Sequence, residues 1–136
     1  MRRMLWFFCL AFYSACSSAE LIQNPYANYK LNPDGSVTYK LDVLRNIIES
    51  GLEPNVYISD KQHPDTKTSF DACRQGIEKL LHRPEMLFLK LTDDLKVLSF
   101  KVYTQRTMHL ILCIKDGGLL RMASYDYRPG LRTIIR

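Results

Sequence analysis

The most regular pattern of apolar and polar positions in this chain runs from Asp65 to Leu81. Charged side chains are interspersed there with a stripe of apolar residues at three- or four-residue spacing: Phe70, Cys73, Ile77 and Leu80. This spacing is that of one face of a helix. We therefore predict a helix over residues 65–81 that packs its apolar face on a sheet, with Cys73 at the centre of that face.

The last third of the chain contains four apolar runs of strand length, rich in β-branched, aromatic and aliphatic residues: residues 86–91, 95–103, 107–114 and 119–127. The polar connections between them are short, which favours antiparallel neighbours. In the third run both alternating sets of side chains are apolar. This run is predicted to be a central strand covered on both faces, by a helix on each side or by a second copy of the protein.

Weaker signals precede the central helix. Residues 32–35, Asn-Pro-Asp-Gly, are typical of a turn, and the alternation after them predicts a short strand over residues 37–41. Asp42 is then expected to cap a helix over residues 43–50. Residues 56–58 fit either a short strand or a covered connection.

The segments at either end of the domain carry little periodicity. Residues 20–31 are expected to form an extended lead-in. Residues 128–136 form a short basic tail, in which Pro129 and Gly130 are expected to break the final strand.

The first nineteen residues have the pattern of a secretory signal peptide. Two arginines precede an apolar run over residues 5–13, and small residues follow as far as Ala19. The apolar run is too short for a membrane-spanning helix. We expect cleavage before Glu20, which leaves residues 20–136 as a single domain.

An alternative processing point lies inside the same segment. Ser14, Ala15 and Cys16 resemble the end of a bacterial lipoprotein signal, in which the cysteine becomes the lipidated first residue. Tyr13 departs from the aliphatic residue that this pattern favours. Ordinary cleavage is therefore the preferred interpretation, and an outer-membrane lipoprotein anchored through Cys16 is the alternative.

The cysteines agree with export. Cys9 and Cys16 fall within the signal, so Cys73 and Cys113 are the two that remain in the domain. Two cysteines in an oxidising compartment usually pair. Together with the elements above, a Cys73–Cys113 bond predicts an α+β fold: an antiparallel sheet of four to five strands, one long helix disulfide-linked to it, and a shorter N-terminal helix.

The charge is mild. The whole chain has a formal net charge of +5, and without the two arginines of the signal, seventeen Lys and Arg remain against fourteen Asp and Glu, or about +3. This excess is too small to indicate a nucleic-acid partner. We expect no nucleic acid, and a membrane contact only if Cys16 is lipidated.

No metal or cofactor site is expected. The candidate ligands do not recur at a spacing that would bring three of them together locally: His63, His82, His109, Asp93 and Asp94.

The chain is also expected not to be an enzyme. It has no Gly-x-Ser-x-Gly nucleophile motif. A small periplasmic hydrolase assembled from distant residues, such as Ser99, His109 and an aspartate, is the less favoured alternative.

Tyrosines and arginines gather near the last strands, and these are residue types that protein interfaces favour. The predicted partner-binding residues are Tyr103, Arg121, Tyr125, Tyr127 and Arg128. The final strand, over residues 119–127, is expected to be an exposed edge that pairs with a protein partner or, in a homodimer, with a second copy.

We therefore predict an exported, noncatalytic protein-binding domain of the bacterial envelope, of the inhibitor or immunity type. An accessory subunit of a secretion or conjugation system is the second version of this prediction. The pattern indicates neither the identity of the target nor the oligomeric state.

Overall fold

The computed structural model describes residues 29–60 and 62–135, and the predicted signal, including Cys16, lies outside them. Within the described residues the elements follow in this order: β1 (Tyr29–Leu31), β2 (Val37–Tyr39), α2 (Leu41–Glu49), β3 (Leu52–Ile58), β4 (Thr66–Lys67), α3 (Phe70–Leu80), β5 (Leu87–Asp93), β6 (Val97–Tyr103), β7 (Thr107–Ile114) and β8 (Leu119–Thr133).

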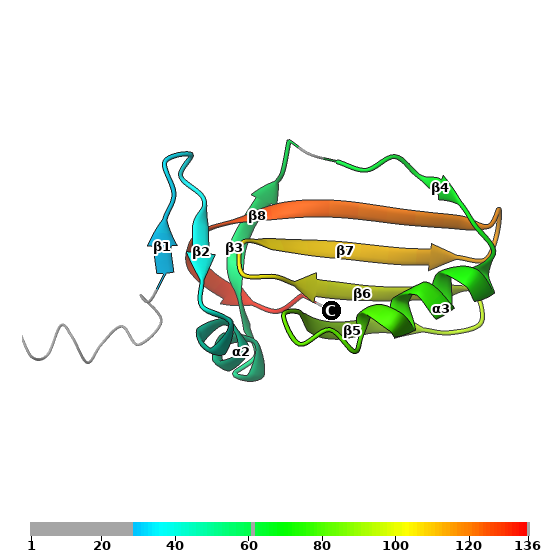
Figure 1. Cartoon of the computed structure of the whole chain (residues 1–136), viewed down its shortest axis with the longest axis horizontal. Helices are drawn as coiled ribbons and strands as arrows, with labels where there is room; N and C mark the ends of the chain where they lie inside the picture. The colour runs from blue at the N-terminus through cyan, green and yellow to red at the C-terminus, as the bar shows by residue number, and fades with distance from the viewer. Residues whose placement is uncertain (1–28, 61, 136) are drawn as a thin grey trace, which may run out of the picture.

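One large antiparallel sheet dominates the molecule (Figure 1). Its strand order is β3-β8-β7-β6-β5, and the short β4 also pairs with β8. The strands β1 and β2 form a separate hairpin beside α2 at one end of this sheet. The predicted turn at residues 32–35 closes that hairpin, with Gly35 at a φ of 82°.

The predicted α+β class with a four- to five-stranded sheet is wrong. Of the described residues, 49% lie in strands and 19% in helices, with six strands in the main sheet and two in the hairpin. The difference arises because segments interpreted as a lead-in, a connection and a tail all pair as strands. The fold is mostly β.

The central helix α3 begins at Phe70, five residues later than predicted. Ser69 caps it, since its Oγ accepts a hydrogen bond from the backbone nitrogen of Ala72 at 3.1 Å. The polar residues before this cap have no apolar face to bury, and Thr66 and Lys67 pair with β8 instead.

The shorter helix α2 also differs at its start. It begins at Leu41 after an extended Lys40 whose side chain makes no capping hydrogen bond. Asp42 therefore lies in the first turn, where its charge favours the helix dipole, and it is not the cap. Gly51, at a φ of 84°, follows the end of the helix.

The C-terminal segment is the second half of a long strand. Residues 119–126 of β8 pair with β7, and residues 125–133 pair with β3. Pro129 and Gly130 do not break it, because Gly130 adopts a φ of 100° near the point where the register with β3 shifts. β8 thus lies between β3 and β7 in the strand order, and the prediction that it is the edge strand of the sheet is wrong.

The buried residues form two cores. The tyrosine core lies between α2, the hairpin and one end of the sheet: Val37, Tyr39, Leu44, Ile47, Tyr103, Met108 and Tyr127. The disulfide core lies under α3: Cys73, Ile77, Leu98, Phe100, Val102, Ile111 and Cys113.

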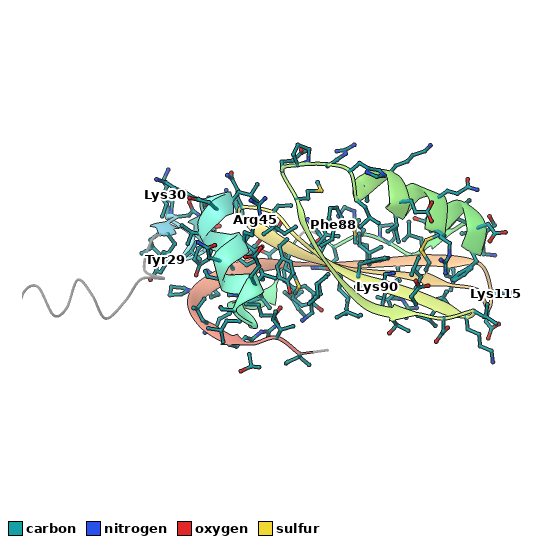
Figure 2. All side chains as sticks on the ribbon, turned by 90° about the horizontal axis from the view of Figure 1, so that it is seen from below. Tyr29, Lys30, Arg45, Phe88, Lys90 and Lys115 are labelled. Atoms are coloured by element: carbon teal, nitrogen blue, oxygen red, sulfur yellow. A yellow bond between two sulfur atoms is a disulfide. The ribbon has the colours of Figure 1, made fainter. Side chains whose placement is uncertain are left out.

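The predicted disulfide is confirmed. The sulfur atoms of Cys73 and Cys113 are 2.02 Å apart and link α3 to β7. Phe70 and Leu80, the other two residues of the predicted stripe, pack against the same core. Figure 2 shows α3 lying along one side of the sheet.

Candidate functional site

The two faces of β7 have different surroundings. Ile111 and Cys113 point into the disulfide core under α3. Beyond the tyrosine core, the opposite face of β7 presents Leu110, Leu112 and Ile114, whose neighbours on β8 are Ala123, Arg121 and Leu119. We call this surface the open face. α3 lies on the other side of the sheet (Figure 2). β7 is a central strand, as predicted. It is also expected to be covered on both faces, but α3 covers only one of them.

A groove lies on the same side as the open face. The end of β8 runs across that side of the sheet, as Figures 1 and 2 together show, and the groove lies beside it. Its volume is about 490 Å³. The side chains that line it are mostly apolar: Val56, Ile58, Leu91, Met108, Leu110, Tyr125 and Ile135, with Lys101 and Arg132 as its cationic residues.

A buried carboxylate holds those cations in place. The side chain of Glu53, on β3, is only 1% exposed. Its Oε1 and Oε2 accept hydrogen bonds from Lys101 Nζ at 3.0 and 3.1 Å, and Arg132 Nε donates to Oε1 at 3.1 Å. The Tyr103 hydroxyl donates to Oε2 at 2.6 Å. Four hydrogen bonds therefore compensate the burial of this charge.

Tyr103 is fixed as a donor in this cluster. The pKa of the Tyr103 hydroxyl is raised far above its ordinary value. Burial is the main cause, and the hydrogen bond to the Glu53 carboxylate is the next. Ionised Tyr103 would place a second negative charge beside Glu53. The hydroxyl is therefore held in its protonated, hydrogen-bond-donating form.

Lys101 and Arg132 differ in how many of their side-chain N–H groups form hydrogen bonds. Lys101 Nζ donates to both oxygens of Glu53 and, at 2.9 Å, to the carbonyl oxygen of Ile135, which accounts for its three protons. Arg132 is 34% exposed, and among the described residues only its Nε has a partner. Its two terminal amino groups therefore remain available at the groove.

The sequence pattern does not predict this cluster. Glu53 lies between the predicted helix over residues 43–50 and the apolar run at residues 56–58, and Arg132 lies in the predicted tail. The alternating positions of Lys101 and Tyr103 on one strand face are the only local signal. Their meeting with Glu53 depends on the pairing of β3 with β8, which is a long-range feature.

A second, polar cleft lies on the α3 side of the sheet, near the end of β3. Its volume is about 680 Å³, and its lining includes His63, His109, Ser124 and Asp126. His109 Nδ1 lies 2.8 Å from Ser124 Oγ, and His109 Nε2 lies 3.1 Å from Thr107 Oγ1. A histidine and two hydroxyl groups thus converge there.

His109 is a neutral base in this setting. Burial is the main cause that lowers the pKa of its imidazole, the nearby His63 lowers it further, and Asp126 acts in the opposite direction. Ser99, the serine considered in the sequence analysis, points to the other face of the sheet, because it pairs with Leu112 rather than with a residue of the His109 face. Ser124, rather than Ser99, lies beside His109, and only the strand register could have revealed this pairing.

The predicted partner-binding residues do not form one surface. Tyr103 and Tyr127 are 1% and 0% exposed, so their side chains do not reach solvent. The Tyr127 hydroxyl donates instead to the carbonyl oxygens of Thr104 and Thr107, both at 2.8 Å. These two tyrosines belong to the core.

The other three residues are accessible but lie apart. Tyr125 lines the groove. Arg121 donates to Asp65 through Nε and a terminal amino group. Arg128 stacks over the Tyr57 ring at 3.4 Å from its centroid. The five predicted residues therefore do not form a single exposed surface.

Among residues 29–60 and 62–135, no three His, Cys, Asp or Glu side chains lie close enough together to hold a metal ion. Neither helix of the described chain has the length and apolar character needed to cross a membrane. Comparisons with protein-family models, with curated proteins and with solved structures found no match. Its own fold defines the class of this protein: a mostly-β domain with a helix disulfide-bonded to one face of an antiparallel sheet.

Proposed function

We propose that this chain is an exported, noncatalytic protein-binding domain of the bacterial envelope, of the inhibitor or immunity type. The observation that carries this proposal is the open face, where half-buried aliphatic side chains such as Leu110 and Leu112 have no helix over them among the described residues. The cross-strand neighbours of Leu112 on this face are Ser99 and Arg121, and a surface that mixes apolar and polar side chains in this way suits a protein interface. The partner in this proposal covers the open face.

The disulfide supports the location. Disulfides form and persist in oxidising compartments, so the Cys73–Cys113 bond is compatible with an extracellular or periplasmic protein. Export by a signal peptide remains a prediction from the first nineteen residues.

The buried charges favour binding over catalysis at this face. Both oxygens of Glu53, the ammonium group of Lys101 and the hydroxyl of Tyr103 are used in hydrogen bonds to one another. A general base or nucleophile needs a group that can reach a substrate. These three residues therefore serve to hold the groove in shape.

Site-specific photo-crosslinking in cells tests the proposed binding face. A photoreactive phenylalanine analogue at Leu112 lies on the open face, and the same analogue at Leu95, which is 84% exposed in the β5–β6 connection, is the matched control. We expect a defined crosslinked protein with the probe at position 112 and none with the probe at position 95. Leu110→Glu should abolish the crosslink from position 112. Equal crosslinking from both positions would contradict the proposal.

The identity of the crosslinked protein separates the two versions of this function. An enzyme or toxin whose activity falls on addition of this domain supports the inhibitor or immunity type. A component of a transport machine supports the accessory-subunit version. A second copy of this chain, confirmed as a dimer by sedimentation, replaces a foreign partner with self-association.

A second function has one observation in its favour. The contact of 2.8 Å between His109 and Ser124 is within the range for a base and a serine nucleophile. Two features oppose it: Ser124 is 4% exposed, and among the described residues no carboxylate is hydrogen-bonded to His109. Labelling with a fluorophosphonate, with Ser124→Ala as control, decides between the two. Labelling that requires Ser124 would establish a hydrolase and overturn the noncatalytic proposal.

A further inference from the structure

The groove combines a mostly apolar lining with two cationic residues. Aliphatic side chains such as Val56, Ile58 and Leu110 form most of its lining, whereas Lys101 and Arg132 are its charged residues. Its volume of about 490 Å³ falls within the range of small-molecule sites. A ligand that matches this lining needs a long apolar part and a single polar end.

The charges of the two cationic residues are not balanced. Lys101 and Arg132 carry two positive charges, and among residues 29–60 and 62–135 Glu53 is the carboxylate with which they form ion pairs. One positive charge is therefore in excess beside a largely apolar lining. A low-dielectric surrounding strengthens the attraction of this excess charge for an anion.

Arg132 is the group that presents this charge. Its Nε is fixed by Glu53 Oε1 at 3.1 Å, which limits the rotation of the guanidinium plane. Within the described residues, its two terminal amino groups have no hydrogen-bond partner, and the residue lines the groove. A guanidinium held in this way is suited to an oxygen anion, because its fork of donors matches carboxylate and phosphate geometry.

We propose that the groove binds a single-chain amphiphile with an anionic oxygen headgroup. The headgroup contacts the terminal amino groups of Arg132, and the alkyl chain lies along Val56, Ile58 and Leu110 toward the open face. The groove shares Leu110 with the open face, and the two proposals are tested at different residues: headgroup recognition at Arg132 and partner binding at Leu112.

Four amphiphiles with the same twelve-carbon chain test the proposal by calorimetry on the oxidised protein: dodecanoate, dodecyl phosphate, dodecanol and dodecyltrimethylammonium. We expect the two anions to bind at least about tenfold more tightly than the alcohol and the cation, because charge-assisted hydrogen bonds are added only for the anions. Tighter binding of dodecanoate indicates a fatty-acid headgroup, and tighter binding of dodecyl phosphate indicates a phosphate headgroup. Equal binding of all four would show unspecific adsorption and overturn the proposal.

Arg132→Gln should weaken the binding of dodecanoate about tenfold and leave the binding of dodecanol unchanged. The matched control is Arg121→Gln, because Arg121 is an exposed arginine on the same strand whose donors are engaged by Asp65. Its affinity for dodecanoate should equal that of the wild type. An unchanged affinity in Arg132→Gln would refute the site.

A second variant avoids the buried cluster. Ile135 lines the groove and is 65% exposed, so Ile135→Glu should fold normally and place a like charge at the site. We expect it to weaken dodecanoate binding about tenfold, whereas Ile135→Gln weakens it much less. Thermal unfolding of each variant confirms that the fold is intact. Equal weakening by the two substitutions would refute a charge-selective site.

Discussion

The two cores of this domain are held by different chemistry. The disulfide core packs aliphatic and aromatic side chains under α3, and the Cys73–Cys113 bond joins the helix to the sheet. The tyrosine core has no covalent link, and three of its buried side chains carry a hydroxyl group: Tyr39, Tyr103 and Tyr127. A buried hydroxyl is stabilised only if it finds a hydrogen-bond partner, and the Tyr103 and Tyr127 hydroxyls have one whereas the Tyr39 hydroxyl does not among the described residues.

This difference shows two ways of holding a helix on a sheet. α3 has eleven residues, a length at which an isolated helix is marginal, and the bond keeps it in place. α2 has nine residues and depends on packing alone, with Leu44 and Ile47 fully buried. The disulfide core should therefore respond to redox conditions, and the tyrosine core to the loss of single polar atoms.

Reduction of the disulfide is expected to have the largest effect on stability. The bond spans a sequence separation of 40 residues, and chain-entropy arithmetic for such a loop gives about 4 kcal/mol. Chemical denaturation with and without reductant measures this difference. Cys73→Ser should give a similar loss in the oxidised protein and no further loss on addition of reductant. Equal stability of the reduced and oxidised wild type would contradict this prediction.

The next largest effect is expected from Glu53→Gln. The substitution keeps the shape of the side chain but leaves Lys101, whose side chain is 8% exposed, without its buried counter-ion. Breaking a buried pair in this way costs roughly 3 kcal/mol. The matched control is Glu49→Gln, since Glu49 is an exposed residue at the end of α2. A loss no greater than that of the control would show that the cluster contributes little to folding.

Two tyrosine substitutions sharpen the contrast inside the tyrosine core. Tyr127→Phe removes a hydroxyl that donates to two carbonyl oxygens and should cost about 1 kcal/mol. The Tyr39 hydroxyl is buried and has no hydrogen-bond partner in the described part of the chain. Tyr39→Phe should therefore be neutral or stabilising. Differential scanning calorimetry of both variants compares them, and the reverse order of stability would contradict the prediction.

The pH dependence of unfolding tests His109, which lies on the same face of the sheet as the disulfide core, opposite Val102 in the register. Its pKa is lowered by burial from the ordinary value of 6.5, so the folded protein binds this proton less readily than the unfolded chain. The contribution of neutral His109 to the free energy of unfolding is therefore fully present above about pH 6.5 and is lost as the pH falls below that value. Stability measured from pH 8 to pH 5 should fall less steeply in His109→Gln than in the wild type. Parallel curves would contradict this assignment.

The smallest effect is expected from the ion pair between Arg121 and Asp65. Arg121 Nη2 lies 2.9 Å from Asp65 Oδ2, but both side chains are about half exposed, so solvent screens the pair. Arg121→Ala should leave the denaturation midpoint unchanged. A clear loss would indicate that the short β4, which follows Asp65, depends on this contact.

The local features of the disulfide core can be predicted from the sequence. The apolar stripe around Cys73 predicts both the buried face of α3 and its link to Cys113. The alternation in residues 107–114 matches the bounds of β7. These signals are strong because helix and strand periodicities are set within a few residues of each other.

The tyrosine core and the groove could not be predicted in this way. Glu53 and Arg132 meet because β3 pairs with the end of β8, and nothing within a few residues of either one indicates that pairing. Pro54 lies in β3 because a proline is tolerated in a terminal strand of a sheet, although proline is otherwise unfavourable in strands. The same long-range register places Ser124 rather than Ser99 beside His109.

The continuity of β8 has a consequence for how the chain folds. Leu52 pairs with Thr133, so the first strand of the main sheet has its partner at the far end of the sequence. Contacts with such separation close large loops before they gain any stabilisation, and domains dominated by them fold in about milliseconds to seconds. During synthesis, β3 therefore waits unpaired until the last fifteen-residue strand is available. β3 can therefore join the main sheet only when the C-terminal strand is present.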